Sequence, residues 1–146
     1  MCFVCGENNP FGIHMHFYEQ DDGTVQGRFC GNDAHQGYTN RMHGGIITSI
    51  LDETMARAIM MSCGDLGCGV TVQMTVRFSR PVPLETDLIA VGRITKEWPR
   101  MFEGAAEIYL PDGVVAAEAT GRYVKVDLGQ MDDFDPERDG WYVRPD

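Results

Sequence analysis

Residues 44–62 are the one segment of this chain with the periodicity of a long amphipathic helix. Its apolar or small residues recur at spacings of three and four, at Ile47, Ile50, Leu51, Thr54 and Ala58. The chain has 146 residues, 43% of them hydrophobic, which is enough for the core of one domain. With a single long helix available, most of that core must be built from strands.

The segments on either side of the helix have strand patterns separated by turns. Six strands are expected, at about residues 12–18, 24–30, 70–78, 86–96, 101–110 and 114–126. From Val70 to Phe78 every second residue is apolar, which predicts a half-buried strand. Short turns join neighbouring strands, so antiparallel pairing is expected. This order predicts an α+β fold in which an antiparallel sheet wraps around one central helix.

Composition and charge limit the partners and the setting. The formal net charge of −10 opposes binding to nucleic acid or to anionic membranes. No stretch approaches the roughly 20 apolar residues of a membrane span. The five cysteines are an odd number and the start lacks a secretory pattern, so a reducing cytoplasm is expected. Residues 1–126 are predicted to form the domain and residues 127–146 a solvated acidic tail.

The start of the helix carries two glycines, Gly44 and Gly45. Their amide N–H groups are not shielded by side chains and lie at the positive end of the helix dipole, where a developing oxyanion can bind. A glycine pair also permits a tight turn from loop to helix, and by itself the pair favours that simpler role.

Asp52 strengthens the chemical interpretation. It lies seven residues after Gly45, on nearly the same helix face and about 10 Å along the axis. That distance is too long for both groups to act on one carbonyl within one chain. In two antiparallel helices related by a twofold axis, each Asp52 would approach its partner's glycines, past the small residues Thr48, Ser49 and Ala56. The spacing predicts a dimer with two composite sites, with a solvated carboxylate as the alternative role of Asp52.

Glu53 is the rival carboxylate. It points about 100° away from Asp52 around the helix, and Arg57 follows it by four residues. This spacing favours an ion pair between Glu53 and Arg57 over a catalytic role for Glu53.

These residues resemble hotdog-fold acyl-CoA thioesterases, in particular the branch of the phenylacetate-pathway thioesterase and its human relatives. The resemblance covers about residues 9–126. The matching stretches are Asn9-Pro10-Phe11-Gly12-Ile13, His35-Gln36-Gly37, His43-Gly44-Gly45-Ile46-Ile47, Leu51-Asp52-Glu53, Val76-Arg77-Phe78 and Arg80-Pro81-Val82-Pro83.

The resemblance implies hydrolysis of acyl-CoA by a homodimer with one continuous sheet, or by a homotetramer of two such dimers. Asp52 would attack the thioester or activate water. The N–H of Gly44, alone or with that of Gly45, would polarise the thioester oxygen from the other subunit. His43 would shape the site or contact the thioester. Thr71 would hydrogen-bond the carboxylate, although strand patterning alone favours an outward-facing threonine.

Substrate binding is expected at Asn40, Arg77 and Arg80. Some relatives have a water-holding Asn where this chain has Gly37, and Asn40 or Gln36 are the candidates to replace it. The basic side chains would bind the CoA phosphates. No metal or cofactor is required by this chemistry. The alternative function is a hotdog module that binds acyl-CoA without turnover, whereas the Asp and His spacing of a hotdog hydratase is absent.

Cys2 and Cys5 have the spacing of zinc ligands. His14 and His16, which share one face of a predicted strand, could complete a set of four. A second Cys-Xaa-Xaa-Cys motif is absent, so the sequence favours small buried thiols over zinc.

Overall fold

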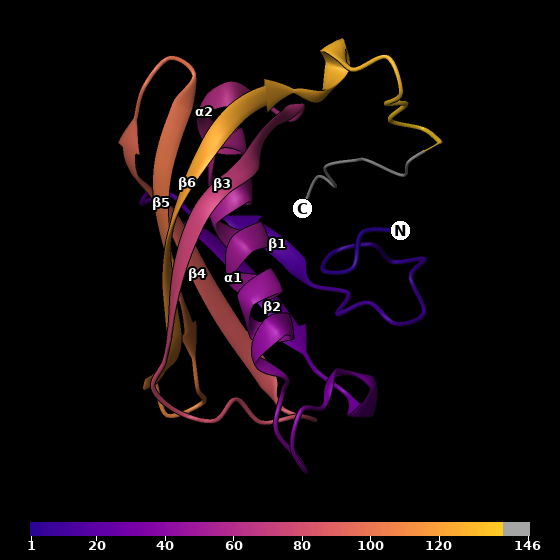
Figure 1. Cartoon of the computed structure of the whole chain (residues 1–146), viewed down its shortest axis with the longest axis vertical. Coiled ribbons are helices and arrows are strands. Elements are labelled where there is room, and N and C mark those ends of the chain that lie inside the picture. Colours follow the sequence, from indigo (N-terminus) through magenta and orange to yellow (C-terminus); the bar gives the residue numbers. More distant parts are fainter. Residues whose placement is uncertain (139–146) are drawn as a thin grey trace.

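The computed structural model describes residues 1–138 and has a six-stranded antiparallel sheet curved around one long helix, α1 (Gly44–Ala58) (Figure 1). The strands are β1 (His16–Glu19), β2 (Val25–Cys30), β3 (Gly67–Phe78), β4 (Asp87–Glu97), β5 (Met101–Tyr109) and β6 (Val115–Asp127). Their spatial order is β1-β2-β4-β5-β6-β3. The predicted α+β class and the hotdog arrangement are confirmed.

The core lies between α1 and the concave face of the sheet. Ile50, Leu51 and Met55 on the helix are fully buried, as are Phe102 on β5 and Tyr123 on β6. The predicted helix at 44–62 is interrupted once, because α1 ends at Ala58 and the short helix α2 (Met60–Cys63) begins after Ile59. Among residues 1–138, no helix combines the length and the apolar composition needed to cross a bilayer.

A glycine on β4 lets the helix approach the sheet closely. A Cβ atom added at Gly92 would lie 2.7 Å from the backbone oxygen of Thr54, which is fully buried on α1. The helix backbone therefore packs directly on the sheet at this point, and any side chain on Gly92 would push the two apart.

The first and third predicted strands differ from expectation. The strand predicted at 12–18 is regular only from His16, because His14 has a φ of 54° and leaves the extended conformation. The strand predicted at 70–78 is half-buried only in its middle, where Met74 and Val76 pack against the core, whereas Val70 and Phe78 are each 52% exposed. Within residues 1–138, β3 is an edge strand that pairs with β6 alone, and an irregularity between Thr71 and Gln73 interrupts its alternation.

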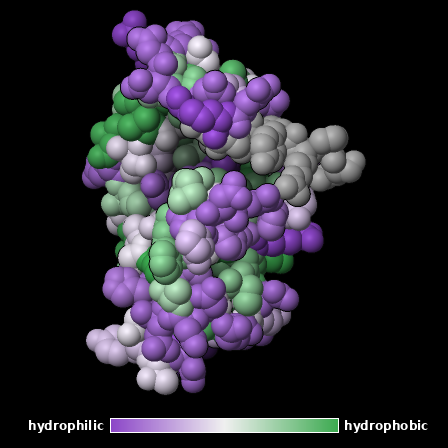
Figure 2. Space-filling model, turned by 90° about the vertical axis from the view of Figure 1, so that its right-hand side faces the viewer, coloured by the Kyte–Doolittle hydropathy of each residue, from purple (hydrophilic) through white to green (hydrophobic). Residues whose placement is uncertain are grey.

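The acidic segment begins where the sheet ends. β6 runs to Asp127, and a short 3-10 helix, Leu128–Gln130, follows it. Residues 139–146 of the predicted tail lie outside the described residues. On the face shown in Figure 2, apolar side chains appear in several separate areas among polar ones.

Gly92→Ala is expected to lower the free energy of unfolding by about 1–3 kcal/mol, because the added methyl group meets the α1 backbone. Urea denaturation followed by circular dichroism measures this change. Thr95→Ala, at an exposed position of the same strand, serves as the control and should cost well under about 1 kcal/mol. Equal stability of Gly92→Ala and wild type would show that the helix does not depend on this close approach.

Candidate active site

Two hydroxyl groups on strands of the sheet hold the carboxylate of Asp52 in place. Its Oδ1 atom accepts a hydrogen bond from Thr71 Oγ1 at 2.8 Å and another from Tyr123 Oη at 2.9 Å. The predicted contact between Thr71 and Asp52 is confirmed. The alternative prediction, that the Thr71 side chain faces outward, is wrong. Asp52 Oδ2 has no hydrogen-bond partner among residues 1–138. One carboxylate oxygen is thus fixed and the other is available to a ligand.

Strand register brings the two hydroxyls together. Thr71 on β3 and Tyr123 on β6 are direct partners in the antiparallel pair, so both side chains point toward α1. The Tyr123 ring is fully buried and stacks on Phe102 with 4.8 Å between the ring centroids. This packing fixes the direction in which the Tyr123 hydroxyl points.

Tyr123 is a functional residue that the sequence analysis missed. A buried tyrosine needs a hydrogen-bond partner for its hydroxyl, and that requirement was the available signal. Burial raises the pKa of Tyr123 well above its usual range, and the nearby charge of Asp52 raises it further. Tyr123 is therefore a neutral donor that orients the carboxylate, and not a proton acceptor.

His43 caps the start of α1 through its ring. The backbone N–H of Gly45 donates to His43 Nδ1 at 2.9 Å, so the ring proton of a neutral His43 lies on the exposed Nε2. The N–H of Gly44 has no acceptor among the described residues. Of the two glycine amides, the cap engages that of Gly45 and leaves that of Gly44 open.

The loop before α1 is organised by His35, which is buried. Its ring accepts from the N–H of Asn32 at 3.0 Å and lies 3.0 Å from the carbonyl oxygen of Phe11. The carbonyl of His35 accepts from the N–H of His43 at 2.9 Å. His35 thereby positions the residue that caps the helix.

The two halves of the predicted site do not meet within one chain. Gly44 and Asp52 are eight residues apart on a continuous helix, which separates them by about 12 Å along its axis. Cavities of about 510 Å³ near Lys125 and about 360 Å³ near Arg122 are lined by neither residue.

The predicted substrate-binding residues lie toward the Gly44 end of α1. The loop that contains Asn40 contacts the segment after β3, where the N–H of Met42 donates to the Val82 carbonyl at 2.9 Å. Arg80 belongs to this segment, and Arg77 near the end of β3 is exposed and 3.6 Å from Glu118. The ring of Phe78 lies beside Gly44. None of the three predicted residues contacts Asp52.

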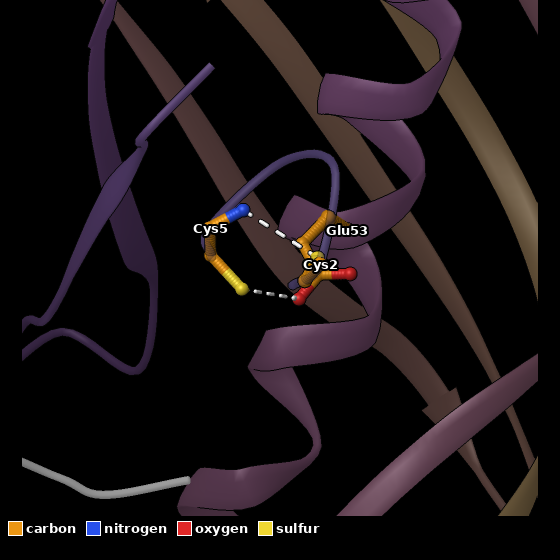
Figure 3. A group of neighbouring side chains, drawn as sticks. All are labelled: Cys2, Cys5 and Glu53. Atoms are coloured by element: carbon orange, nitrogen blue, oxygen red, sulfur yellow. Dashed lines mark hydrogen bonds between the residues drawn. The ribbon is translucent and has the colours of Figure 1, made fainter. Parts of the chain in front are cut away.

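Glu53 faces away from this site. Its Oε1 lies 3.0 Å from Arg57 Nε, which confirms the predicted ion pair. Cys2 and Cys5, from the start of the chain, lie against the same side of α1. Their sulfur atoms lie within 4.8 Å of a Glu53 oxygen and of each other (Figure 3). The hydrogen bond between the two thiols lowers the pKa of Cys2 to about 6 and raises the pKa of Cys5 well above its usual range.

The predicted histidine partners of this cysteine pair lie elsewhere. His14 Nε2 is 2.7 Å from the carbonyl oxygen of Asn9, and His16 Nε2 is 3.9 Å from Glu7. The expectation of buried thiols is wrong for Cys2, which is exposed.

Comparison with known families agrees with this fold. A family model described as the thioesterase superfamily matches residues 39–117, which contain α1 and most of the sheet. The chain belongs to the thioesterase superfamily.

Members of this superfamily occur among both characterised proteins and solved structures. The bovine (Bos taurus) acyl-coenzyme A thioesterase THEM4 is 26% identical over 127 residues, which are 86% of this chain and 51% of that protein. The mouse (Mus musculus) THEM4 is 23% identical over 112 residues, 76% of this chain and 47% of that protein. The chain thus spans about half the length of these relatives.

A solved thioesterase superfamily protein, RHA08564, is 27% identical with a TM-score of 0.76, over 83% of this chain and 61% of that protein. The protein BH2602 from Bacillus halodurans, solved with CoA, shares the fold at 23% identity. Its TM-score is 0.69, over 78% of this chain and 75% of that protein.

Tyr123→Phe is expected to reduce the free energy of unfolding by about 1–2 kcal/mol, because a hydrogen bond to a carboxylate is lost while ring packing is kept. Urea denaturation provides the measurement. Tyr38→Phe is the matched control, since Tyr38 is 82% exposed and its loss of a hydroxyl should be neutral. A Tyr123→Phe protein as stable as this control would show that the bond to Asp52 contributes little to the fold.

Proposed function

We propose that this protein hydrolyses acyl-CoA thioesters to a free acid and CoA. In the proposed homodimer, Asp52 of one subunit and Gly44 of the other act on the same thioester. The observation that carries this proposal is the Asp52 carboxylate, which two hydroxyls hold through one oxygen while the other stays available. The superfamily match and the name of the bovine relative support the reaction class.

The chemistry assigned to Asp52 uses its open oxygen, Oδ2. In one route this oxygen attacks the thioester carbon, expels the CoA thiolate and forms a mixed anhydride that water then opens. In the other route it removes a proton from a water molecule that attacks the same carbon. Both routes consume one water and release one acid and one thiol. Thr71 and Tyr123 keep the carboxylate at a fixed angle in either case.

The negative charge that develops on the thioester carbonyl oxygen needs a hydrogen-bond donor. The open N–H of Gly44 at the positive end of α1 supplies one, and a neutral His43, the residue before it, offers its exposed Nε2–H. Since Gly44 is remote from Asp52 along its own helix, the proposal requires the amide of a second subunit.

The exposed flank of one chain is suited to such a subunit. β3 offers an unpaired edge with Val70 and Val72, which are 52% and 57% exposed. On α1, Thr48 and Ser49 turn their hydroxyls onto the carbonyls of Gly44 and Gly45, at 2.8 and 3.0 Å. The helix flank is therefore small and locally satisfied, and a second antiparallel helix can approach it closely.

Binding of the CoA portion is assigned to the region around the Gly44 end of α1. Arg77 and Arg80 provide local positive charge there in a chain with a net charge of −10. BH2602, which shares this fold, was solved with CoA. An acyl-CoA-binding module without turnover is the alternative, and it would use the same surface.

Asp52→Asn is expected to lower kcat for thiol release from a panel of acyl-CoAs by about 10²–10⁴-fold, because the amide cannot act as a base or nucleophile. The release of free thiol is followed by its reaction with a chromogenic disulfide. Asp22→Asn is the matched control, since Asp22 lies in the β1–β2 turn at the far edge of the sheet. Wild-type protein that binds acyl-CoA but releases no thiol would support the binding module instead.

Gly44→Pro tests the oxyanion donor with little change to the helix. Proline is favoured at the first helical position, and the extended ψ of 135° at His43 suits a following proline. We expect kcat to fall by about 10²–10³-fold because the N–H is removed. Gly44→Ala keeps the N–H, and its added Cβ would lie an ordinary 3.6 Å from Phe78, so a much smaller loss is expected.

The two variants together test the composite site. A heterodimer of an Asp52→Asn and a Gly44→Pro subunit, purified through a different tag on each, has one site with both defects and one intact site. We expect it to regain about half of the wild-type kcat if the dimer is built in this way. A heterodimer as inactive as its parents would contradict a site shared between subunits.

A further inference from the structure

The segment before β1 is folded back on itself by its own backbone hydrogen bonds. The N–H of Ile13 donates to the Phe3 carbonyl at 2.9 Å, and the N–H of Met15 donates to that of Val4 at 2.8 Å. The Val4 side chain is buried in the core. This packing brings Cys2 and Cys5 to the face of α1 that carries Glu53 (Figure 3).

The chain turns tightly between the two cysteines. The N–H of Gly6 donates to the Cys2 carbonyl at 3.0 Å, and the N–H of Cys5 points to Cys2 Sγ at 3.5 Å. A Cβ atom at Gly6 would lie 2.5 Å from the backbone nitrogen of Cys2, so the turn requires glycine. The result places both sulfur atoms on one side of the loop, where a backbone N–H can stabilise a thiolate.

Arg57 already places one positive charge beside the cysteines, so a bound dication would share their negative charge with it. Arg57 Nη2 donates to Cys5 Sγ at 3.0 Å, while Arg57 Nε donates to Glu53 Oε1 at 3.0 Å. Two thiolates and one carboxylate would carry three negative charges, of which Arg57 balances one. A divalent ion would balance the remaining two, and the arginine already orients two of the donor atoms.

We propose that Cys2, Cys5 and Glu53 bind one Zn²⁺ ion, with water as the fourth ligand. The three donor atoms lie within 4.8 Å of one another, a spread that a tetrahedral ion can bridge. Thiolates favour zinc over calcium or magnesium. Binding replaces all but one of the ion's water ligands with two thiolate sulfurs and one carboxylate oxygen, and releases to solvent the protons that the thiols still carry. The ion would clamp the segment before β1 onto α1 through Glu53, which directly follows Asp52 in the chain.

Cobalt substitution gives a direct test. The full chain, reduced and free of any histidine tag, is titrated with Co²⁺ and then with Zn²⁺. We expect one equivalent of Co²⁺ to produce a sulfur-to-cobalt charge-transfer band, which Zn²⁺ abolishes. Cys2→Ser and Cys5→Ser should lose the band, and Glu53→Gln should weaken binding at least tenfold. Cys30→Ser is the matched control, because Cys30 lies at the end of β2 outside the cluster.

A stability measurement separates metal binding from simple loss of packing. Zinc is expected to raise the Tm of wild type by several degrees and to leave that of Cys2→Ser unchanged. The proposal is overturned if reduced wild type takes up no Co²⁺, if Cys2→Ser binds it equally, or if zinc raises both Tm values alike. It is also overturned if mass spectrometry of the purified protein shows a Cys2–Cys5 disulfide that re-forms after reduction in the presence of equimolar zinc.

Discussion

The position of the Asp52 carboxylate depends on hydrogen bonds from the opposite side of the core. A carboxylate that is partly withdrawn from water is costly unless donors satisfy it. Thr71 and Tyr123 supply those donors from two different strands, which are partners in one antiparallel pair. A slip of one residue between β3 and β6 would turn one of the two hydroxyls to the outer face. The register of this strand pair and the geometry of the site are therefore a single property of the fold.

Close contact between helix and sheet makes those bonds short enough. Gly92 lets the α1 backbone rest on β4, and Gly69 leaves space for the ring of Phe102, on which Tyr123 stacks. A Cβ atom at Gly69 would lie 2.6 Å from that ring. Small residues on the concave face thus determine how far the tyrosine hydroxyl must reach, and the buried aromatic pair determines its direction.

The sequence predicted local features well and non-local ones poorly. The apolar periodicity of α1 and the ion pair of Glu53 with Arg57 depend on residues within one or two helical turns, so both could be predicted. Tyr123 was missed because its contact with Asp52 spans 71 residues and depends on a strand register that no local pattern reveals. The alternation from Val70 to Phe78 predicts a half-buried strand, whereas β3 is an edge strand of the described sheet in which Met74 and Val76 are partly buried and the other three apolar side chains are exposed.

The cap of α1 bears directly on its proposed chemical role. Helices are commonly capped by Ser, Thr, Asn or Asp, and an aspartate there would bring a negative charge to the positive end of the dipole. Here the cap is the ring of His43, and the first turn of α1 contains no acidic residue. The ring engages the amide of Gly45 without adding a negative charge, so the field at the Gly44 N–H is not cancelled locally. A helix start of this kind stabilises an anion that appears during a reaction more than one capped by a carboxylate. The choice of a histidine cap therefore favours oxyanion binding over a purely structural turn at the glycine pair.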